Sequence, residues 1–492
     1  MSSPPEIRCR ASQMPLPGKT PPAPRRPEAQ PHHTTLPTRV LIPSGVLGFG
    51  FERDALRRGL ARAPHAIVID GGSTDSGPFY LGAGVSKYSR ASTKAEWRAL
   101  MEARAEAGVP LVIGSAGTCG TDAMVDWMVA ITDEVAGELG QRVRVATVRS
   151  SQSPDAIAAA FDAGRLVALP DAPEIGRGDI ESCRHIVALA GAEPFREALA
   201  TGADIVIAGR ATDTAGIAAL PLMNGEHPGA AWHGAKVAEC GALCSTRPMS
   251  GVVLVTVDES GFTVEPQAVG ARCTPHSVSA HMLYENADPF VLAEPGGALD
   301  VTHARYRPID DRSVRVTGSE WLPSDPYTVK LEGAGFAGFQ TTALVLLRNR
   351  RYVENAGRWV ERLGRFLADE IPARTGVAAR DFALDFRIIG RDAALGALEK
   401  RGGDANEVGI LCTVTADTQE TAHEIAKLAN PFLLHFPLTE DEELPTFAFP
   451  YSPAETDRGP LYEFRLNHAL VLDDPMSAFT LDTLELGHGA PR

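Results

Sequence analysis

Residues 69–84 form the part of this chain that is richest in groups able to do chemistry, with the sequence IDGGSTDSGPFYLGAG. Its two carboxylates, Asp70 and Asp75, are suited to proton transfer or to metal binding. Glycine lets the backbone approach a ligand closely, so the loop could also present bare N–H groups to an anion. The residues expected to bind substrate here are Gly71, Gly72, Ser73 and Thr74. A surface loop between a strand and a helix would have a similar composition, so this stretch alone leaves both interpretations open.

Four further segments of the same kind each follow an apolar run that predicts a strand. They are residues 45–50, 114–122, 171–174 and 210–213. Strands that alternate with helices form parallel sheets, and ligands bind at the carboxyl ends of their strands. The five loops are therefore predicted to meet along one rim of a sheet. Such loops need turn and capping residues in any case, and Asp122 and Asp213 could simply cap helices.

Arg210, at the carboxyl end of one expected strand, is well placed to hold a substrate carboxylate or phosphate in a bidentate pair. Asp213, three residues later, could fix that arginine in place. Gly117 and Thr118 are expected to contribute backbone N–H groups that hold developing negative charge. Cys119 precedes an expected helix, whose N-terminus would lower the thiol pKa and make it a candidate nucleophile. A small buried cysteine is the commoner fate of this residue type.

In the second half of the chain, the segment with the most side chains able to do chemistry is residues 273–289, CTPHSVSAHMLYENADP. His281 and Glu285 would share one face of the helix expected over residues 277–285, as a metal-binding or acid–base pair. An ordinary surface contact has the same spacing, and the segment is not the HExxH motif of metalloproteases. Lys330, in the segment YTVKLEG, could act as a base or an anion ligand, or could be an exposed strand lysine.

The bulk composition excludes several classes of protein. The 492 residues carry 47 Lys and Arg against 62 Asp and Glu, a net charge of −15, so nucleic acid is not an expected partner. No apolar run reaches the roughly 18 residues of a membrane span, and no secretory signal is present, so a cytoplasmic location away from membranes is expected. The seven cysteines include no CxxC pair, which argues against an iron–sulfur cluster or a zinc ribbon.

Nucleotide-binding and hydrolase motifs are missing from the sequence as well. The glycines of residues 45–50 are spaced GxxGxG, whereas the NAD-binding fingerprint is GxGxxG. There is no P-loop GK[ST] and no GxSxG elbow. The sequence therefore does not predict which cofactor is used. Asp70, Asp75 or Asp213 could bind a divalent metal, but the spacing of these residues does not match a known metal-binding motif.

The order of the expected elements predicts an α/β fold in three parts. Residues 1–37 hold ten prolines and are expected to be disordered, or to result from a wrongly assigned start codon. Residues 38–248 predict a mostly parallel sheet with helices on both faces, which carries the main ligand loops. Residues 249–485 predict an α+β domain with a mixed or antiparallel sheet. Strands are expected at residues 66–69, 110–113, 143–148, 166–169 and 203–208, and helices at 94–106, 122–139, 154–163, 277–285, 352–370 and 419–429.

An ordered series of segments resembles the acyclic terpene utilisation family, formerly a family of unknown function. The series is SGVLGFGFERDAL, DGGSTDSGPFYLG, GADIVIAGRATDTA, VAECGAL, SVSAHMLYENADP, SVRVTGSEWLP and YTVKLEGAGFAGF. GPLYEFRLNHALVLDDP is similar to the end of the longer members, so the resemblance extends over roughly residues 40–475. It implies catabolism of acyclic terpenes or of small branched or polycarboxylic acids, in a pathway that runs through acyl-CoA thioesters. The family brings no established catalytic residues to transfer.

The leading hypothesis is a cytoplasmic catabolic enzyme, a lyase or isomerase. Its substrate would be a small carboxylate, either branched or with several carboxyl groups, or the CoA ester of such an acid. Proton abstraction next to a carbonyl would give hydration, dehydration or isomerisation. The expected acid–base residues are Asp70, Asp75, His281 and Glu285. One alternative is a non-catalytic substrate- or CoA-binding subunit that needs a partner chain. A second alternative, which the sequence favours less, is a nucleotide-binding phosphotransferase. Assembly as a homo-oligomer also stays open.

Overall fold

The computed structural model, which describes residues 36–487, is built around a ten-stranded sheet. Its strands are β1 (Thr38–Ile42), β2 (Ala66–Ile69), β3 (Leu111–Ile113), β4 (Val143–Arg149), β8 (Ile205–Ala208), β9 (Val253–Asp258), β10 (Gly261–Pro266), β13 (Arg305–Pro308), β14 (Val314–Thr317) and β20 (Thr480–Leu486). They are ordered β13-β14-β10-β9-β1-β2-β3-β8-β4-β20. The five strands from β1 to β4 in this order are parallel, whereas β9 and β20 pair antiparallel with the two ends of that group. The predicted α/β class is confirmed.

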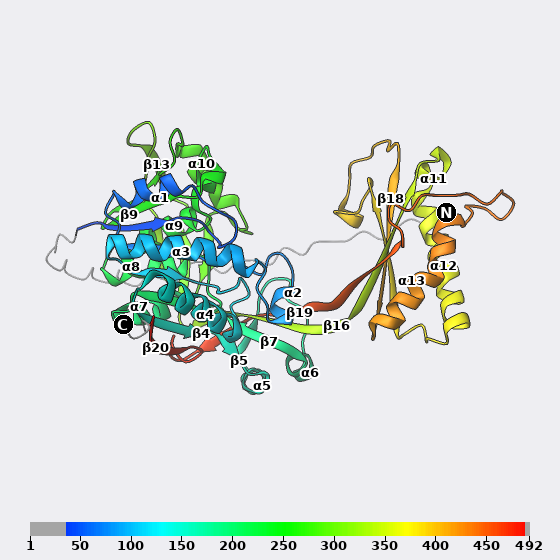
Figure 1. The fold of residues 1–492 in the computed structure, drawn as a ribbon, viewed down its shortest axis with the longest axis horizontal. Coiled ribbons are helices and arrows are strands. Elements are labelled where there is room, and N and C mark those ends of the chain that lie inside the picture. Colours follow the sequence, from blue (N-terminus) through cyan, green and yellow to red (C-terminus); the bar gives the residue numbers. More distant parts are fainter. Residues whose placement is uncertain (1–35, 488–492) are drawn as a thin grey trace, which may run out of the picture. The chain divides into compact units, whose positions relative to one another are not determined.

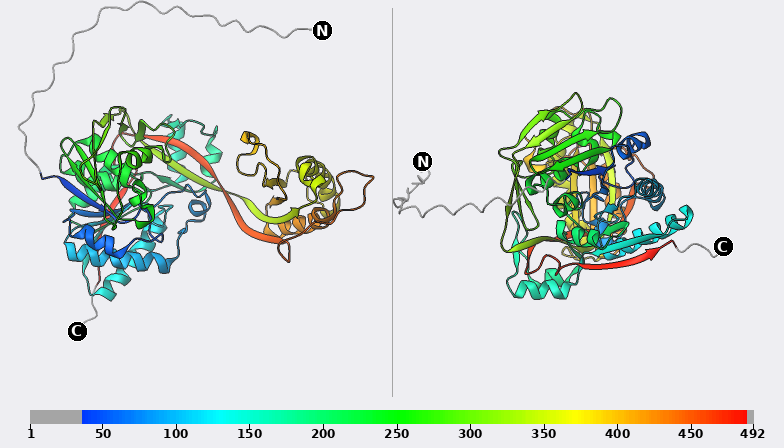
Figure 2. Two further views of the ribbon diagram at one scale, coloured as in Figure 1. Left: turned by 90° about the horizontal axis from the view of Figure 1, so that it is seen from above. Right: turned by 90° about the vertical axis from the view of Figure 1, so that its left-hand side faces the viewer.

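Helices cover both faces of this sheet (Figures 1 and 2). One layer holds α7 (Ala192–Ala200), α8 (Ala215–Met223) and α9 (Pro228–Ala238), and the other holds α1 (Arg53–Leu60), α3 (Arg90–Ala107) and α4 (Asp122–Leu139). Along β1, Val40 and Ile42 pack in the first layer and Leu41 in the second. The parallel strands are apolar at consecutive positions because each face of the sheet buries its own side chains.

A second sheet has seven strands. It consists of β5 (Ser151–Gln152), β6 (Leu166–Ala168), β7 (Cys183–Ala188), β16 (Tyr327–Leu347), β17 (Phe382–Ile389), β18 (Val408–Ala416) and β19 (Glu455–Leu472). The first part of β16 pairs with β7 and the last part with β18, while β19 pairs along both parts. The long strands β16 and β19 can be followed in Figure 1.

The last part of β16 and β18 form a core of their own with α11 (Arg350–Glu354), α12 (Ala356–Thr375) and α13 (Gln419–His435). Trp359 and Leu363 on α12 are fully buried in it. A three-stranded sheet, β11 (Val291–Glu294), β12 (Gly297–Asp300) and β15 (Glu320–Pro323), has no backbone pairing with either larger sheet. The remaining α-helices described are α2 (Phe79–Ala83), α5 (Pro154–Asp162), α6 (Arg177–Glu181) and α10 (Pro275–Ala280).

Some predicted elements differ from those observed. The helix expected at residues 122–139 is present with these bounds. β6 pairs antiparallel with β19 and not within the parallel sheet, so residues 171–174 do not lie on the predicted rim. A short apolar strand does not by itself specify its partner. The helix expected over residues 277–285 ends at Ala280, and a 3-10 turn, η3 (His281–Leu283), follows.

The boundary expected at residue 248 does not interrupt the central sheet. β9 follows that position in the chain and pairs along the whole of β1. Without β9 and β20, the two outer parallel strands would present unpaired N–H and C=O groups. Residues 36–487 accordingly belong to one compact unit. The disordered segment expected at residues 1–37 lies almost entirely outside the described residues.

Candidate functional site

The loops after β2, β3 and β8 meet at one rim of the central sheet, because these strands are parallel neighbours. Asp70 follows β2, Ser115 lies just after β3, and Arg210 lies just after β8. The loops touch closely: a Cβ atom on Gly71 would lie 2.0 Å from the carbonyl oxygen of Gly114. Gly71 also has a φ of 102°, so glycine is required at this position.

The protein itself engages most backbone N–H groups of this rim. Gly71 N–H donates to a carbonyl of the neighbouring loop at 2.8 Å, and Gly72 N–H donates to Asp70 Oδ2 at 3.2 Å. Thr118 N–H donates to another carbonyl at 2.7 Å. Gly117 has a φ of 65° and packs against a methionine side chain. These contacts serve close packing of the loops, and anion binding by these residues stays a prediction.

Arg210 and Glu332 form a buried ion pair at the centre of the rim. Nε of Arg210 donates to Oε2 at 3.1 Å and Nη2 to Oε1 at 3.3 Å. Nη1 donates to Ser115 Oγ at 3.0 Å and to the Ala211 carbonyl at 2.8 Å, and Thr74 donates to Glu332 at 3.0 Å. Burial acts to raise the pKa of Glu332, but Arg210, Lys330 and the Thr74 hydroxyl together outweigh it and lower that pKa to about 2. Arg210 thus binds a carboxylate of its own chain, where the sequence predicted a substrate carboxylate.

A further group of charged side chains lies next to this pair: Asp70, Asp213, Lys236, Glu239 and Glu294. Lys236 donates to Glu239, and Asp213 lies 3.6 Å from Arg210. Burial raises the pKa of Asp70 well above its ordinary value, and the charges of Asp213 and Glu239 raise it further against the opposing effect of Arg210. Burial also raises the pKa of Asp213 and Glu239, and that of Glu294 to about 7. The surroundings therefore favour the protonated form of these carboxyls more than water would.

Four buried polar atoms at this site have no hydrogen-bond partner within residues 36–487. They are Asp70 Oδ1, Glu239 Oε2, Glu294 Oε2 and His281 Nε2. Asp70 is 7% exposed, Glu239 1% and His281 6%. Buried polar atoms in proteins are nearly always hydrogen-bonded, so several unpartnered acceptors in one place indicate a site for an external donor or a cation. Burial and, to a smaller extent, the charge of Lys236 lower the pKa of His281 to about 4, so its imidazole is neutral at neutral pH.

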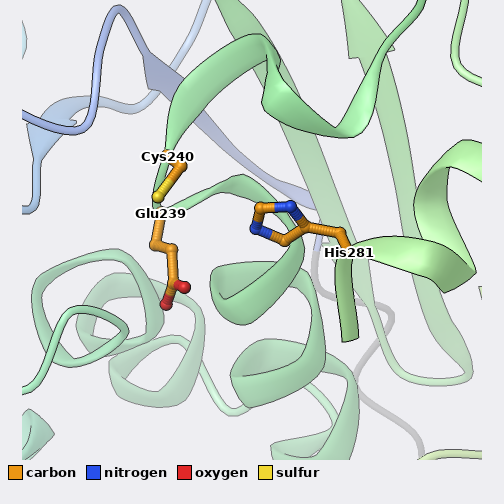
Figure 3. Close-up of side chains that lie close together, drawn as sticks. All are labelled: Glu239, Cys240 and His281. Carbon is orange, nitrogen blue, oxygen red and sulfur yellow. The ribbon is translucent and has the colours of Figure 1, made fainter. Parts of the chain in front are cut away.

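Three side chains gather where α9 ends. Glu239 and Cys240 directly follow Ala238, the last residue of α9, and His281 begins η3. One ligand atom from each of Glu239, Cys240 and His281 lies within 4.8 Å of the other two. Figure 3 shows the His281 ring directed toward the other two side chains. Oxygen, sulfur and nitrogen donors thus converge from two separate segments of the chain.

The outer edge of the site is open to solvent. Asp75 and Glu285 are exposed, Tyr284 is 41% exposed, and the Lys330 side chain is 42% exposed. Glu285 shares hydrogen bonds with Tyr284 and with Asp75. Lys330 Nζ lies 3.4 Å from Glu332 Oε1. The charged side chains therefore extend continuously from the surface to the buried carboxyls.

Eight residues predicted from the sequence converge at this site. They are Asp70, Thr74, Asp75, Arg210, Asp213, His281, Glu285 and Lys330. His281 and Glu285 do so without sharing a helical face, because α10 ends at Ala280 and Glu285 has a φ of 58°. Cys119 is the small buried cysteine that was the commoner expectation, and not the nucleophile: its side chain is fully buried and donates to the Val85 carbonyl, and burial raises its pKa.

Sequence reasoning missed Lys236 and Glu294. Every residue from Gly229 to Ala238 is buried, so a lysine in this Ala- and Gly-rich helix requires a buried partner. Glu239, three residues after Lys236, supplies it. The three-residue spacing of Lys236 and Glu239 could therefore have predicted this buried pair from the sequence. Glu294 ends a short strand, and its bond of 2.7 Å from the Thr214 hydroxyl joins residues 80 positions apart, for which the sequence gives no signal.

Comparison with models of known protein families assigns the chain to one of these families. The model of the acyclic terpene utilisation family protein AtuA matches residues 86–439. The chain belongs to the AtuA family. This match confirms the resemblance, and it includes Arg210, Glu239, His281 and Glu332 of the site but not Asp70. No curated protein and no solved structure matches this AtuA family member. Among its described helices, none combines the length and apolar content needed to cross a membrane.

Proposed function

We propose that this AtuA family member is an acid–base enzyme, a lyase or an isomerase, that acts on a small branched carboxylic acid or its CoA thioester. The reaction is transfer of a proton at the carbon next to the carbonyl, which leads to hydration, dehydration or isomerisation of a double bond. Family membership associates the chain with acyclic terpene utilisation, and the acyl chains derived from such terpenes are branched.

Asp70 carries this proposal. Its Oδ1 atom is buried without a partner in the described structure, while Gly72 N–H holds Oδ2 at 3.2 Å and so orients the carboxyl. A general base works best when its pKa lies near the working pH, which for an aspartate requires a raised value. Burial raises the pKa of Asp70, and Asp213 and Glu239 add to this effect. Such perturbed carboxyls at a strand-end rim are typical of catalytic groups.

Two other residues support the same chemistry. Lys330 is the exposed cation of the site, since its side chain is 42% exposed whereas that of Arg210 is 5% exposed and paired with Glu332. Lys330 is therefore the residue that we expect to bind an anionic group of the substrate. Glu294, whose pKa burial raises to about 7, supplies a second carboxyl that can exchange a proton near neutral pH.

Solvent deuterium exchange tests the proposal. The purified protein is incubated in deuterated water with a panel of branched carboxylic acids and their CoA thioesters, and each recovered compound is analysed by mass spectrometry. We expect deuterium next to the carbonyl of at least one probe. Asp70→Asn should slow its incorporation about a hundredfold or more, the usual contribution of a general base.

Asp171→Asn is the matched control. Asp171 is exposed and belongs to the loop of residues 171–174, which does not lie on the rim of the central sheet. Its φ is 59°, a value that asparagine also adopts. Exchange should continue in this variant at the rate of the unaltered protein. Absence of exchange with every probe, or an undiminished rate in Asp70→Asn, would contradict the proposal. Exchange that occurs only after a partner chain is added would instead support the substrate-binding subunit.

A further inference from the structure

We infer that Glu239, Cys240 and His281 form a binding site for one divalent transition-metal ion of the zinc class. This site is distinct from the carboxylates Asp70, Asp75 and Asp213 that the sequence marked as possible metal ligands. It also stands independently of the proposed reaction, because metal binding can be measured directly on the purified protein.

The donor set selects the class of ion. A thiolate, an imidazole and a carboxylate together suit Zn²⁺ and its near relatives, whereas Mg²⁺ and Ca²⁺ take oxygen ligands almost exclusively. The candidate ligand atoms of Glu239, Cys240 and His281 lie within 4.8 Å of one another. Only small movements of the side chains are needed to bring all three to bonding distance from one ion, at about 2.0–2.3 Å.

Two of the three ligands are buried and aimed at the site with unsatisfied atoms. Glu239 is 1% exposed and His281 6% exposed, yet Glu239 Oε2 and His281 Nε2 both lack a partner in the part of the chain that the structure describes. An unpartnered buried carboxylate oxygen and an unpartnered imidazole nitrogen facing the same point are costly unless something binds them. A metal ion would satisfy both at once.

The backbone that carries two of the ligands is held firmly. A Cβ atom on Gly45 would lie 2.9 Å from the Glu239 carbonyl oxygen and 3.1 Å from Cys240 Cα, so the loop after β1 packs directly on this turn. The His281 ring stacks on Tyr284, with centroids 5.5 Å apart. Metal sites depend on this kind of support, because ligands fixed before binding lose little entropy when the ion arrives.

The surrounding charges also favour a cation. Lys236 donates to Oε1 of Glu239 and leaves Oε2 for the metal, as an outer-shell partner does in known sites. Its positive charge opposes metal binding, whereas each of Asp70, Asp213 and Glu294 acts on the same place with the opposite sign when it is ionised, and a bound cation would favour that ionised form. Three protein ligands leave one position of a tetrahedral ion for water or substrate, which is the pattern of catalytic zinc sites and not of structural ones.

Co²⁺ is the probe for this site, because a cobalt–thiolate bond gives a charge-transfer absorption in the near ultraviolet. The full chain is stripped of metal with a chelator and titrated with Co²⁺, then with Zn²⁺ in competition. We expect one equivalent of Co²⁺ to bind with the thiolate absorption, and Zn²⁺ to displace it. Cys240→Ser should abolish the absorption, and His281→Gln should weaken binding by about a hundredfold or more, since loss of an outer partner alone costs 10–100-fold.

Cys244→Ala is the matched control, because Cys244 is a buried cysteine four residues from Cys240 and is not among the proposed ligands. It should keep both the stoichiometry and the absorption. Circular dichroism of each variant shows whether it has folded, and if Cys240→Ser does not fold, His281→Gln decides the matter. Failure of the folded protein to bind Co²⁺ or Zn²⁺ would overturn the inference, as would an unchanged cobalt–thiolate band in Cys240→Ser. Either result would leave the deuterium-exchange test of Asp70 unaffected.

Discussion

Replacing Glu332 with glutamine should destabilise the protein strongly and in a pH-dependent way. Gln keeps the shape of the side chain but removes the charge that Arg210 binds at 3.1 and 3.3 Å, so the buried guanidinium loses its closest carboxylate and retains only the longer contact with Asp213, at 3.6 Å. The pKa of Glu332 falls from its ordinary 4.5 to about 2, which corresponds to about 3 kcal/mol at about 1.4 kcal/mol per pKa unit. Breaking a buried ion pair typically costs about 3–5 kcal/mol, in agreement with this value.

The pH dependence follows from the direction of that shift. Because the pKa of Glu332 is lower in the folded state, its stabilising effect is complete above the unfolded pKa of about 4.5 and is lost as the pH falls toward 2. By pH 3 about 2 kcal/mol of it should be gone. The difference in unfolding free energy between the unaltered protein and Glu332→Gln should therefore be large at pH 7 and much smaller at pH 3. Urea unfolding followed by tryptophan fluorescence measures both.

A matched control is Asp54→Asn, which removes a carboxylate from an ion pair whose two side chains are 76% and 75% exposed. Exposed pairs contribute little, so its urea midpoint should hardly move. Replacing both Arg210 and Glu332 by apolar residues should cost less than Glu332→Gln alone, since neither member of this pair is then left buried without the other. A cost below about 1 kcal/mol for Glu332→Gln, or an equal cost at both pH values, would refute this reasoning.

Three further predictions concern other parts of the structure. Gly71→Ala should cost at least about 2 kcal/mol more than Gly77→Ala in urea unfolding, because both residues have positive φ but only at Gly71 would the new Cβ meet a carbonyl oxygen, at 2.0 Å. Lys330→Met should raise the KM for an anionic substrate about tenfold with little change in the unfolding midpoint, and an unchanged KM would remove Lys330 from the binding site. Leu363→Ala should lower stability by about 2–5 kcal/mol because the side chain is fully buried, whereas Leu398→Ala, at a position 74% exposed, should leave it nearly unchanged by the same measurement.

The sequence predicts local elements and their loops well. β2 and α4 are present with the predicted bounds, because apolar runs and helix periodicity are properties of neighbouring residues. The rim position of Asp70 follows from the general rule that parallel strands share their carboxyl ends. These features need only the order of elements along the chain.

Pairings between distant segments could not be predicted in this way. Arg210 binds Glu332, which lies 122 residues later, and no local pattern distinguishes that carboxylate from a ligand. β6 contains three apolar residues that fit either sheet, and only its distant partner β19 decides the outcome. The sequence thus locates the rim, whereas the role of each charged side chain depends on contacts that only the folded chain reveals.

The last strand of the fold has a consequence for how the protein is made. β20, at Thr480–Leu486, pairs antiparallel with β4, at Val143–Arg149, and so covers an edge of the central sheet with residues that leave the ribosome more than 300 positions later. At a synthesis rate of about 5–20 residues per second, this delay is on the order of half a minute. Throughout that interval β4 has an open edge, which is the kind of surface that recruits chaperones or pairs with other nascent chains.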